Sequence, residues 1–363
     1  MLKHLFHNFV LKGTDWLFRA RSIELQIIKS AFAVLIAVFG GPPLVAIILR
    51  LIWGTVPDGY LIAQKAIDNV DGWILLICSV AILAALGMFI LRVRGETKNR
   101  SKKRVVVIEG RGLRDDDGAP LDQFVSGKVE GQIIPVLLDL RNRLDGKIIE
   151  PERALEDILA AHRSVLQHKK NVERSDLTTV YGGLTSVPYT FLTGLLLDDE
   201  SGISTYDWDR AQESWRSLDM QDDGMVFKVS GIENLISATE VVIALAFSYP
   251  INDEDLKSTF SYPVVRLTLD GLSSDAHWSQ KKQNRLAQQF FEVVKQLNAA
   301  GAKRIHLVMA APNSAVFTFG RRYDKRNLPE LVVYQYERGN DPAYPWGILM
   351  PVAETERPQV IYN

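Results

Sequence analysis

Two stretches near the amino terminus hold no charged residue over 20 positions each. Residues 30–49 read SAFAVLIAVFGGPPLVAIIL, and residues 72–91 read GWILLICSVAILAALGMFIL. An α-helix rises about 1.5 Å per residue, so each stretch is about 30 Å long, which matches the hydrocarbon core of a bilayer. The pattern predicts a transmembrane hairpin over residues 30–91, with spans at about 30–50 and 72–92.

Beyond residue 104 the hydrophobic pattern changes to that of an α/β protein. Apolar β-branched runs predict strands at 105–108, 241–247, 264–269, 305–309 and 331–334, and apolar periodicity predicts helices at 132–144, 151–172, 276–300 and 314–325. The last third alternates strand and helix as parallel βαβ units do. Residues 105–235 resemble a second unit of similar composition, although no repeat is defensible from identities.

Basic residues flank the hairpin and are sparse in its loop. Five lysines and arginines precede the first span and seven follow the second, in a basic linker at 92–104, whereas the loop holds Arg50 and Lys65. The positive-inside rule therefore predicts that both termini are cytoplasmic. Residues 1–29 space their apolar residues as a helix does, among basic ones. This favours an amphipathic segment that lies on the inner leaflet or packs on a neighbouring chain.

The motif Gly40-Gly41-Pro42-Pro43 falls in the middle of the first predicted span. Proline removes a helix donor and clashes with the preceding turn, so the motif predicts a kink or a short unwound stretch. The sequence leaves open whether this break is only structural or serves as a gate or packing hinge.

Composition and charge narrow the possible functions. Hydrophobic residues make up 47% of the 363 positions. Cys78 is the single cysteine, so an internal disulfide and a thiolate zinc cluster are both excluded. The net charge of −1 divides into +8 for residues 1–104 and −9 for residues 105–363. A domain with a net charge of −9 is a poor binder of nucleic-acid polymers.

No catalytic constellation is present in the sequence. The chain lacks a G-x-S-x-G elbow and a P-loop, and its six histidines show no metal-like spacing. We therefore expect neither an enzyme nor a bound metal or cofactor. The acidic clusters Asp115–Asp117 and Asp198–Glu200 keep one alternative open, a membrane-anchored enzyme that processes nucleotides with a metal ion, although solvated loops are the default interpretation.

Polar and glycine-containing segments that follow the expected strands suggest a site for a small anion, because ligands of open α/β sheets bind beyond the carboxyl ends of the strands. A helix that opens near Asn313 and Ser314 would offer free N–H groups to a phosphate, unless these residues are a plain N-cap. Tyrosine rings would stack on bases. We expect the ligand-binding residues to be Tyr181, Gly183, Ser186, Tyr189, Ser248, Tyr249, Ala311, Asn313, Ser314 and Arg321, most of them in one cleft between the two units.

Several short motifs together resemble the SAVED domain of bacterial anti-phage systems. They are Tyr181-Gly182-Gly183-Leu184, Val187-Pro188, Phe191-Leu192, Gly194, Asp198-Asp199-Glu200, Asp207-Trp208-Asp209-Arg210, Trp215-Arg216, His306-Leu307, Ala310-Ala311-Pro312, Gly320-Arg321 and Val333-Tyr334. The resemblance spans residues 105–363. It implies two fused Rossmann-like (CARF-like) units that recognise a cyclic oligonucleotide, made by a partner synthase of the CBASS defence system.

In that family the amino-terminal module is the effector, so the resemblance implies a two-transmembrane SAVED effector of the inner membrane. Two isolated helices leave a bilayer intact, so we expect the ligand to drive homo-oligomerisation, disruption of the membrane lipid and abortive infection. Another alternative is a ligand-gated ion channel, because Thr55-Val56-Pro57-Asp58-Gly59-Tyr60 is similar to the potassium filter T-V-G-Y-G. Pro57-Asp58 interrupts that match, and the loop is short for a pore helix.

Overall fold

The computed structural model describes residues 80–91, 94, 102–112, 119–141, 143–144, 147–148, 150–170, 172–198, 202–235, 238–324, 326–352 and 355–363. The chain divides into two compact units, Met1–Arg100 and Ser101–Asn363. Residues 80–91 form a helix. The amphipathic segment, the first predicted span, the loop and the rest of the second span lie outside the described residues. Within those residues, no helix has both the length and the apolar character needed to cross a bilayer.

The larger part of the chain, Ser101–Asn363, begins with a five-stranded sheet in the order β2-β1-β5-β6-β7. Four strands are parallel, namely β1 (Arg104–Arg111), β2 (Gln132–Asp139), β5 (Leu177–Leu184) and β6 (Ile203–Asp209), and β7 (Ser214–Ser217) is antiparallel to β6. The helices of this part are α6 (Leu121–Val125), α7 (Pro151–Lys169) and α8 (Val187–Leu196). A small pair, β3 (Arg143–Leu144) and β4 (Lys147–Ile148), stands apart from the sheet.

A seven-stranded sheet follows, in the order β14-β13-β12-β11-β9-β10-β8. Its strands are β8 (Phe227–Ser230), β9 (Glu240–Ala246), β10 (Val264–Leu269), β11 (Arg304–Ala310), β12 (Glu330–Gln335), β13 (Trp346–Leu349) and β14 (Gln359–Tyr362). Its helices are α9 (Asp253–Thr259), α10 (Gln280–Ala299) and α11 (Asn313–Arg322). β9, β10, β11 and β12 are parallel, and β8, β13 and β14 are antiparallel to their neighbours.

The two sheets share one connectivity. The order β2-β1-β5-β6-β7 recurs as β10-β9-β11-β12-β13, with the fifth strand antiparallel in both cases. The helices correspond as well, because α6, α7 and α8 occupy the same places in the chain order as α9, α10 and α11. Residues 101–363 therefore contain two α/β units of the same topology, in agreement with the pair of fused units that the resemblance to the SAVED domain implied.

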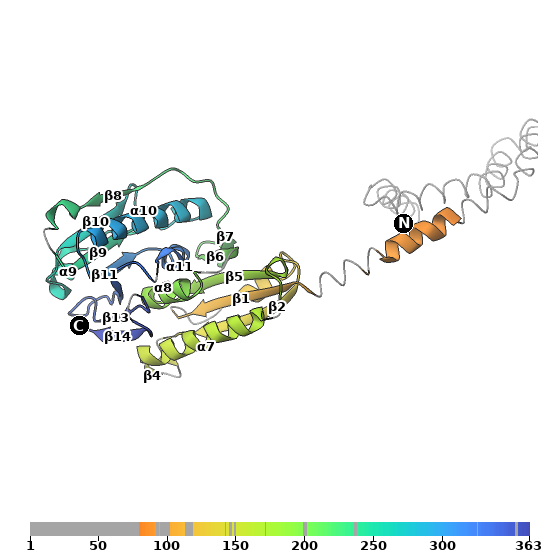
Figure 1. Ribbon diagram of the computed structural model, residues 1–363, viewed down its shortest axis with the longest axis horizontal. Helices are drawn as coiled ribbons and strands as arrows, with labels where there is room; N and C mark the ends of the chain where they lie inside the picture. Colours follow the sequence, from red (N-terminus) through yellow and green to blue (C-terminus); the bar gives the residue numbers. More distant parts are fainter. Residues whose placement is uncertain are drawn as a thin grey trace, which may run out of the picture. The chain divides into compact units, whose positions relative to one another are not determined.

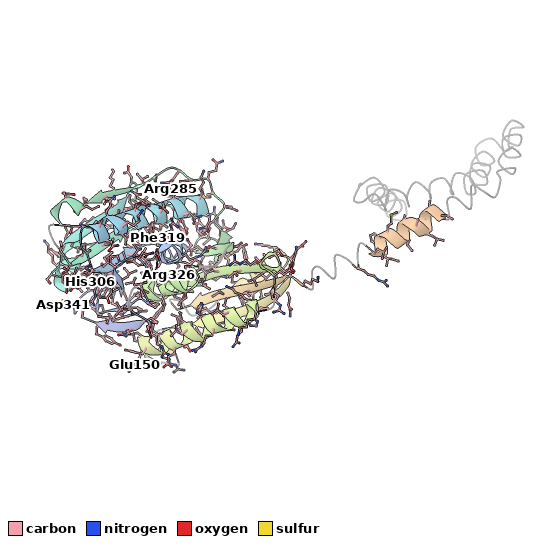
Figure 2. The ribbon with its side chains drawn as sticks, viewed as in Figure 1. Glu150, Arg285, His306, Phe319, Arg326 and Asp341 are labelled. Atoms are coloured by element: carbon pink, nitrogen blue, oxygen red, sulfur yellow. The ribbon has the colours of Figure 1, made fainter. Side chains whose placement is uncertain are left out.

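The main core lies between the sheets. α8 and α11 run side by side there (Figure 1), and buried residues of both sheets and of these two helices form a single apolar cluster. Phe319 of α11, labelled in Figure 2, is fully buried in this cluster. Smaller clusters cover the outer faces, beside α6 on the first sheet and beside α9 on the second. Since the cluster is continuous, the two α/β units bury their apolar faces on each other.

Local sequence signals explain most of the helix boundaries. Pro151 opens α7 at a position where its missing N–H costs nothing. The hydroxyl of Ser279 accepts a hydrogen bond from the backbone N–H of Lys282 at the start of α10. Gly301, just beyond that helix, has a φ of 103°, which glycine adopts without strain. The predicted helix at 276–300 is therefore confirmed with shorter bounds.

The prediction of a helix at 132–144 is wrong. Residues 132–139 form β2, which pairs with β1 along its full length. The segment holds adjacent isoleucines and Pro135, which favour a strand at a sheet edge over a helix. The apolar run was short enough to fit either period, so periodicity alone did not separate helix from strand.

Candidate functional site

The carboxyl ends of the parallel strands define the candidate site. Tyr181 and Gly183 lie on β5, and Ser186 immediately precedes α8, which holds Tyr189. The other predicted residues belong to the second sheet. Ser248 and Tyr249 follow β9, Ala311 follows β11, and Asn313, Ser314 and Arg321 lie on α11. The topology thus places most of the ten residues at or just beyond the ends of β5, β9 and β11.

Asn313 joins the two α/β units. Its Oδ1 accepts hydrogen bonds from the backbone N–H of Thr185 (3.0 Å) and from the hydroxyl of Thr190 (2.7 Å), and its Nδ2 donates to the carbonyl oxygen of Thr185 (3.2 Å). The side chain is therefore fixed between the end of β5 and the first turns of α8. Its observed contacts are structural, and a ligand would have to replace them to use the amide.

A buried carboxylate occupies the start of α11. Oδ2 of Asp207, on β6, accepts a hydrogen bond from the backbone N–H of Ser314 (3.0 Å), and Asp207 is 3% exposed. A helix N-terminus favours an anion, so this side chain stands where the sequence predicted a phosphate. The hydroxyl of Ser314 accepts a hydrogen bond from Gln283 of α10 (2.8 Å). Both polar groups of Ser314 are thus engaged within the protein.

His277 packs beside the same carboxylate. Its Nε2 lies 3.6 Å from Oδ2 of Asp207, and the ring is 5% exposed. Burial lowers the pKa of His277 below the ordinary range, although the negative charge of Asp207 acts in the opposite direction. Because the imidazole of His277 is neutral, it does not act as a cation beside Asp207. The positive end of the α11 helix dipole stabilises the negative charge of this carboxylate instead.

Two of the predicted tyrosines are core residues. Tyr181 is 1% exposed and stacks on Phe317 of α11, with ring centroids 3.7 Å apart. Tyr189 is 2% exposed and packs against Trp346. Burial raises the pKa of both phenols above the usual range. Since their rings already stack on protein side chains, a role in stacking on bases remains a prediction that requires rearrangement.

Ser248 and Tyr249 lie at the end of β9, where Tyr249 is exposed and Ser248 is buried. Tyr249 is 58% exposed, so its ring is open to a planar partner. The hydroxyl of Ser248 is buried and has no hydrogen-bond partner among the described residues. Gly183 lies near the end of β5 and Ser186 precedes α8, whereas Ala311 follows β11 of the second sheet. Of the ten predicted residues, Ser248 and Tyr249 fit a ligand-binding role with the least change.

Arg321 lies at the opposite end of α11 from Asn313. Its Nε donates to the carbonyl oxygen of Leu197 (3.4 Å), and burial lowers the pKa of its guanidinium while Asp198 opposes that shift. The structure therefore does not bring Arg321 together with the start of the helix. Asp199, Glu200 and the Asp115–Asp117 cluster lie outside the described residues, and among the residues that are described no group of acidic, histidine or cysteine side chains is arranged to hold a metal.

The residues that organise this region most directly were not among the ten predicted. Asp207, Gln283 and His277 connect β6, α10 and α11, and Thr190 holds Asn313. The sequence did contain one signal for Asp207. The motif Asp207-Trp208-Asp209-Arg210 is among those that resemble the SAVED domain. In the structure Asp207 falls on the buried side of β6, where a carboxylate needs a specific partner.

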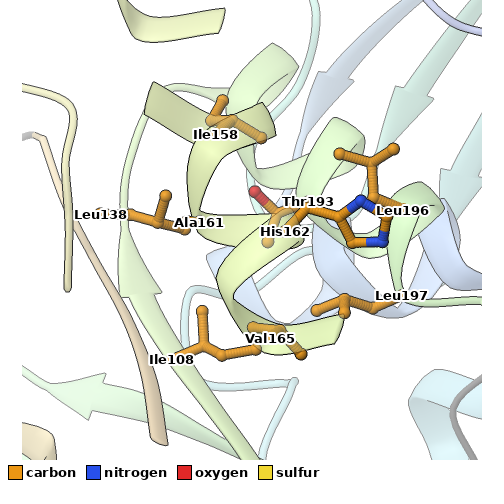
Figure 3. Close-up of a pocket in the computed structure, with 9 residues that line it drawn as sticks. All are labelled: Ile108, Leu138, Ile158, Ala161, His162, Val165, Thr193, Leu196 and Leu197. Atoms are coloured by element: carbon orange, nitrogen blue, oxygen red, sulfur yellow. The ribbon is translucent and has the colours of Figure 1, made fainter. Parts of the chain in front are cut away.

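A small pocket lies between α7 and α8 (Figure 3). It has a volume of about 10 Å³, and its wall is mostly apolar, with His162 and Thr193 as polar members. That volume suits no more than a single water molecule. This cavity is therefore a packing defect, and none of the ten predicted residues lines it.

Two family models match this chain. The model described as the SMODS-associated and fused to various effectors sensor domain, SAVED, matches residues 159–350, which is just over half of the chain. The model described as the SAVED-fused 2TM effector domain matches residues 3–155. No curated protein matches the chain.

Two bacterial receptors are among the solved structures that match this chain. The Acinetobacter baumannii Cap4 SAVED/CARF-domain containing receptor with the cyclic trinucleotide 2'3'3'-cAAA is 12% identical, with a TM-score of 0.46 over 76% of this chain and 60% of that chain. The Moraxella osloensis Cap4 SAVED/CARF-domain containing receptor is 14% identical, with a TM-score of 0.43 over 77% and 59%. The present chain thus spans about 60% of the length of the receptors that it matches.

Proposed function

Because this chain belongs to the SAVED family, we propose that it is a two-transmembrane effector of bacterial CBASS defence, activated by a cyclic oligonucleotide. The observation that supports this most strongly is the order of the two family matches. A SAVED-fused 2TM effector domain over residues 3–155 adjoins a SAVED sensor domain over residues 159–350 in one chain. Sensing and output are then parts of a single polypeptide, and the chain is not an enzyme.

The ligand would bind along the carboxyl ends of the strands. Tyr249 offers an exposed ring for a base, and the unpartnered hydroxyl of Ser248 offers a donor beside it. The soluble region has a net charge of −9, so a phosphorylated ligand has to be held by local N–H and hydroxyl groups. This arrangement suits a small cyclic ligand better than a nucleic-acid polymer.

Ligand binding is tested by the thermal stability of the full-length protein in detergent. Cyclic di-, tri- and tetranucleotides are added one at a time, beginning with 2'3'3'-cAAA and 3'3'3'-cAAA, the trinucleotides held by the Acinetobacter receptor. One of them should raise the melting temperature in proportion to its differential affinity for the folded state. The ligand should be recovered intact by chromatography, and its conversion to a product would support the enzyme alternative instead.

The output would be damage to the inner membrane. A single hairpin cannot enclose a pore, so ligand would have to bring many hairpins together, and small residues such as Gly41, Ala84 and Gly87 would let the helices approach closely. The test uses cells that express the protein with or without the partner synthase. Dye entry together with a large species on native gels is the expected result. Membrane damage by a species that stays small would contradict assembly, and an ion-selective conductance would favour the channel alternative.

Topology is tested separately, by cysteine labelling of intact cells. In a Cys78→Ser background, a cysteine replaces Asp58 in one variant and Ser101 in another. With both termini in the cytoplasm, an impermeant reagent labels the variant at position 58 and leaves the variant at position 101 unlabelled. The reverse pattern would refute the proposed orientation.

A further inference from the structure

A cleft opens on the outer face of the seven-stranded sheet, on the side that α9 covers in part. Its volume is about 280 Å³. Alternate residues of each strand point to this face, and they include Glu240 of β9, His306 of β11 and Tyr334 of β12 (Figure 2 labels His306). None of the ten predicted ligand-binding residues lines the cleft, so it is distinct from the edge where the cyclic oligonucleotide would bind.

Aromatic rings line one side of this cleft. The ring of Tyr262 stacks on His306, with centroids 4.6 Å apart and planes inclined by 14°, and Tyr262 is 36% exposed. Phe260 meets Tyr334 edge-on, with centroids 4.9 Å apart. These rings line the cleft, and an aromatic face attracts a cation through its quadrupole.

Hydrogen bonds hold the polar side chains of the cleft, His306, Tyr334 and Glu240, in one arrangement. Nδ1 of His306 lies 2.9 Å from the hydroxyl of Tyr334, and Nε2 lies 2.9 Å from Oε2 of Glu240. Burial lowers the pKa of His306 more than its hydrogen bond to Glu240 raises it, so the imidazole is neutral near pH 7. In the neutral ring, Nε2–H donates to Glu240 and Nδ1 accepts from Tyr334. The carboxylate of Glu240 therefore has two neutral donors on this side, the imidazole of His306 and the hydroxyl of Tyr262, and no protonated imidazole.

The charges at the rim do not balance. Nε and Nη2 of Arg304 both donate to Oε2 of Glu330, at 2.9 and 2.7 Å, whereas Nη1 lies 3.9 Å from Glu240. Two carboxylates thus share one guanidinium, and the guanidinium is directed mainly at Glu330. The side chain of Glu240 is 31% exposed. A negative charge in contact with both the cleft and the solvent remains for a ligand to neutralise.

We propose that this cleft binds a primary alkylammonium ion, supplied by a free aliphatic diamine or by a lysine side chain of a partner protein. The ammonium group would pair with Glu240 beside the ring of Tyr262, in the manner of a cation held by an aromatic face and a carboxylate. The aliphatic stem would lie on the apolar floor, which Val332, Leu349 and Ile361 form. A neutral or anionic ligand of the same length lacks the charge that the site selects.

The test is calorimetric titration of the full-length protein in detergent at low salt. The probes are cadaverine, whose stem has the length of a lysine side chain, Nα-acetyl-lysine methylamide, and the neutral analogue 1,5-pentanediol. Saturable binding of an amine without binding of the diol is the expected result. Tighter binding of cadaverine identifies a free diamine as the ligand, and tighter binding of the lysine derivative identifies a protein side chain. Absence of binding by both amines, or equal binding of the diol, would overturn the proposal.

Three variants locate the site. Glu240→Gln keeps an acceptor for His306 but removes the charge, and it should weaken amine binding about tenfold. Tyr262→Ala, outside the strands, should weaken it about fivefold. Arg304→Met removes the competing cation and should strengthen binding, which a merely structural change would not do. Unchanged affinity in both Glu240→Gln and Tyr262→Ala would refute the site.

The matched control is Glu254→Gln, which removes an exposed carboxylate from α9 and should leave amine affinity unchanged. Cyclic oligonucleotide binding by the same variants should match that of the wild type. The two proposals therefore fail independently, because the outer face and the carboxyl ends of the strands share none of the residues tested.

Discussion

Gly194 of α8 and Gly320 of α11 are reciprocal contacts of the two central helices. A β-carbon added at Gly194 would lie 2.3 Å from the carbonyl oxygen of Phe317, and one added at Gly320 would lie 2.3 Å from the carbonyl oxygen of Phe191. Each helix reads Phe-x-x-Gly at this point. The two units therefore meet through the same contact made twice, in opposite directions, and main chain packs against main chain.

Gly320→Ala should destabilise the protein by about 3 kcal/mol, because the added methyl group meets a backbone oxygen that no side-chain rotation can move. The measurement is the midpoint of urea unfolding by pulse proteolysis of the full-length protein. Asn284→Ala, on the exposed side of α10, is the control and should cost nothing. A Gly320→Ala midpoint equal to that of the control would show that the helices separate easily.

Asp207→Ala should cost about 2 kcal/mol of stability, because it leaves the backbone N–H of Ser314 without its buried acceptor. Asp207→Asn keeps an oxygen at that position and should cost less. Asp219→Ala, an exposed carboxylate that accepts a bond from Ser217, serves as the control with little effect. The same unfolding measurement applies, and equal losses for the alanine and asparagine variants would contradict the role of the acceptor.

Asp223 and Lys282 should respond unequally to mutation. Nζ of Lys282 lies 2.6 Å from Oδ2 of Asp223, and the lysine side chain is 1% exposed whereas the aspartate side chain is 40% exposed. Asp223→Ala leaves a buried ammonium without a partner and should cost about 2–3 kcal/mol, whereas Lys282→Met should be close to neutral. Unfolding midpoints of the two variants decide this, and a larger loss for Lys282→Met would refute the argument.

Stability should fall as the pH is lowered from 7.5 to 5.5. Burial lowers the pKa of His306 and of His277 in the folded state, so below the unfolded pKa of about 6.5 the unfolded chain binds protons that the folded chain does not. Stability is complete above that pKa and is lost as the pH falls toward the folded values. His306→Gln, which retains polar groups for Glu240 and Tyr334, should flatten this dependence.

The control for the pH experiment is His168→Gln, near the end of α7, which should leave the slope of midpoint against pH unchanged. An equal slope in His306→Gln and the wild type would show that the hydrogen bond and the negative charge of Glu240 offset both the burial of the ring and the positive charge of Arg304.

Tyr249→Ala should weaken binding of the cyclic oligonucleotide by about 1–3 kcal/mol, the loss of one base stacked on an aromatic ring. The side chain is 58% exposed, so the unfolding midpoint should not change. Tyr336→Ala, at a tyrosine that is 45% exposed beyond β12, is the matched control and should bind the ligand normally. Equal affinity in both variants would remove Tyr249 from the site.

The sequence predicted the elements whose pattern is local and strong. α7, α10 and the strands at 105–108, 241–247, 264–269, 305–309 and 331–334 appear where periodicity and β-branched runs indicate them. The shared topology of the two units was visible only as a similar composition. Strand order is set by pairing between distant segments, and few identities beyond the Phe-x-x-Gly of α8 and α11 record it.

The sequence predicted the strand ends at which the candidate residues lie, but not the contacts that these residues make. The strand ends after β5, β9 and β11 lie where the βαβ pattern indicated, so Tyr249 and Ser248 remain the best candidates. The partners of Asn313 and Ser314 are Thr185 and Asp207, both more than 100 positions away in the chain. The start of α11 could be predicted from the sequence, and with it the free backbone N–H groups of its first turn. The sequence does not show that one of these N–H groups, that of Ser314, donates to the carboxylate of Asp207 on β6.

The glycine contact between α8 and α11 also limits how a bound ligand can act. Side chains slide and change rotamer, whereas two main chains in contact form a stiff joint that resists bending and shear. A ligand bound across the strand ends would therefore contact a rigid surface, because the two α/β units do not close around it. On the function proposed above, binding would act through the surface that one molecule offers to the next, and the signal would pass outward by assembly of copies, with no bending needed at the contact between α8 and α11.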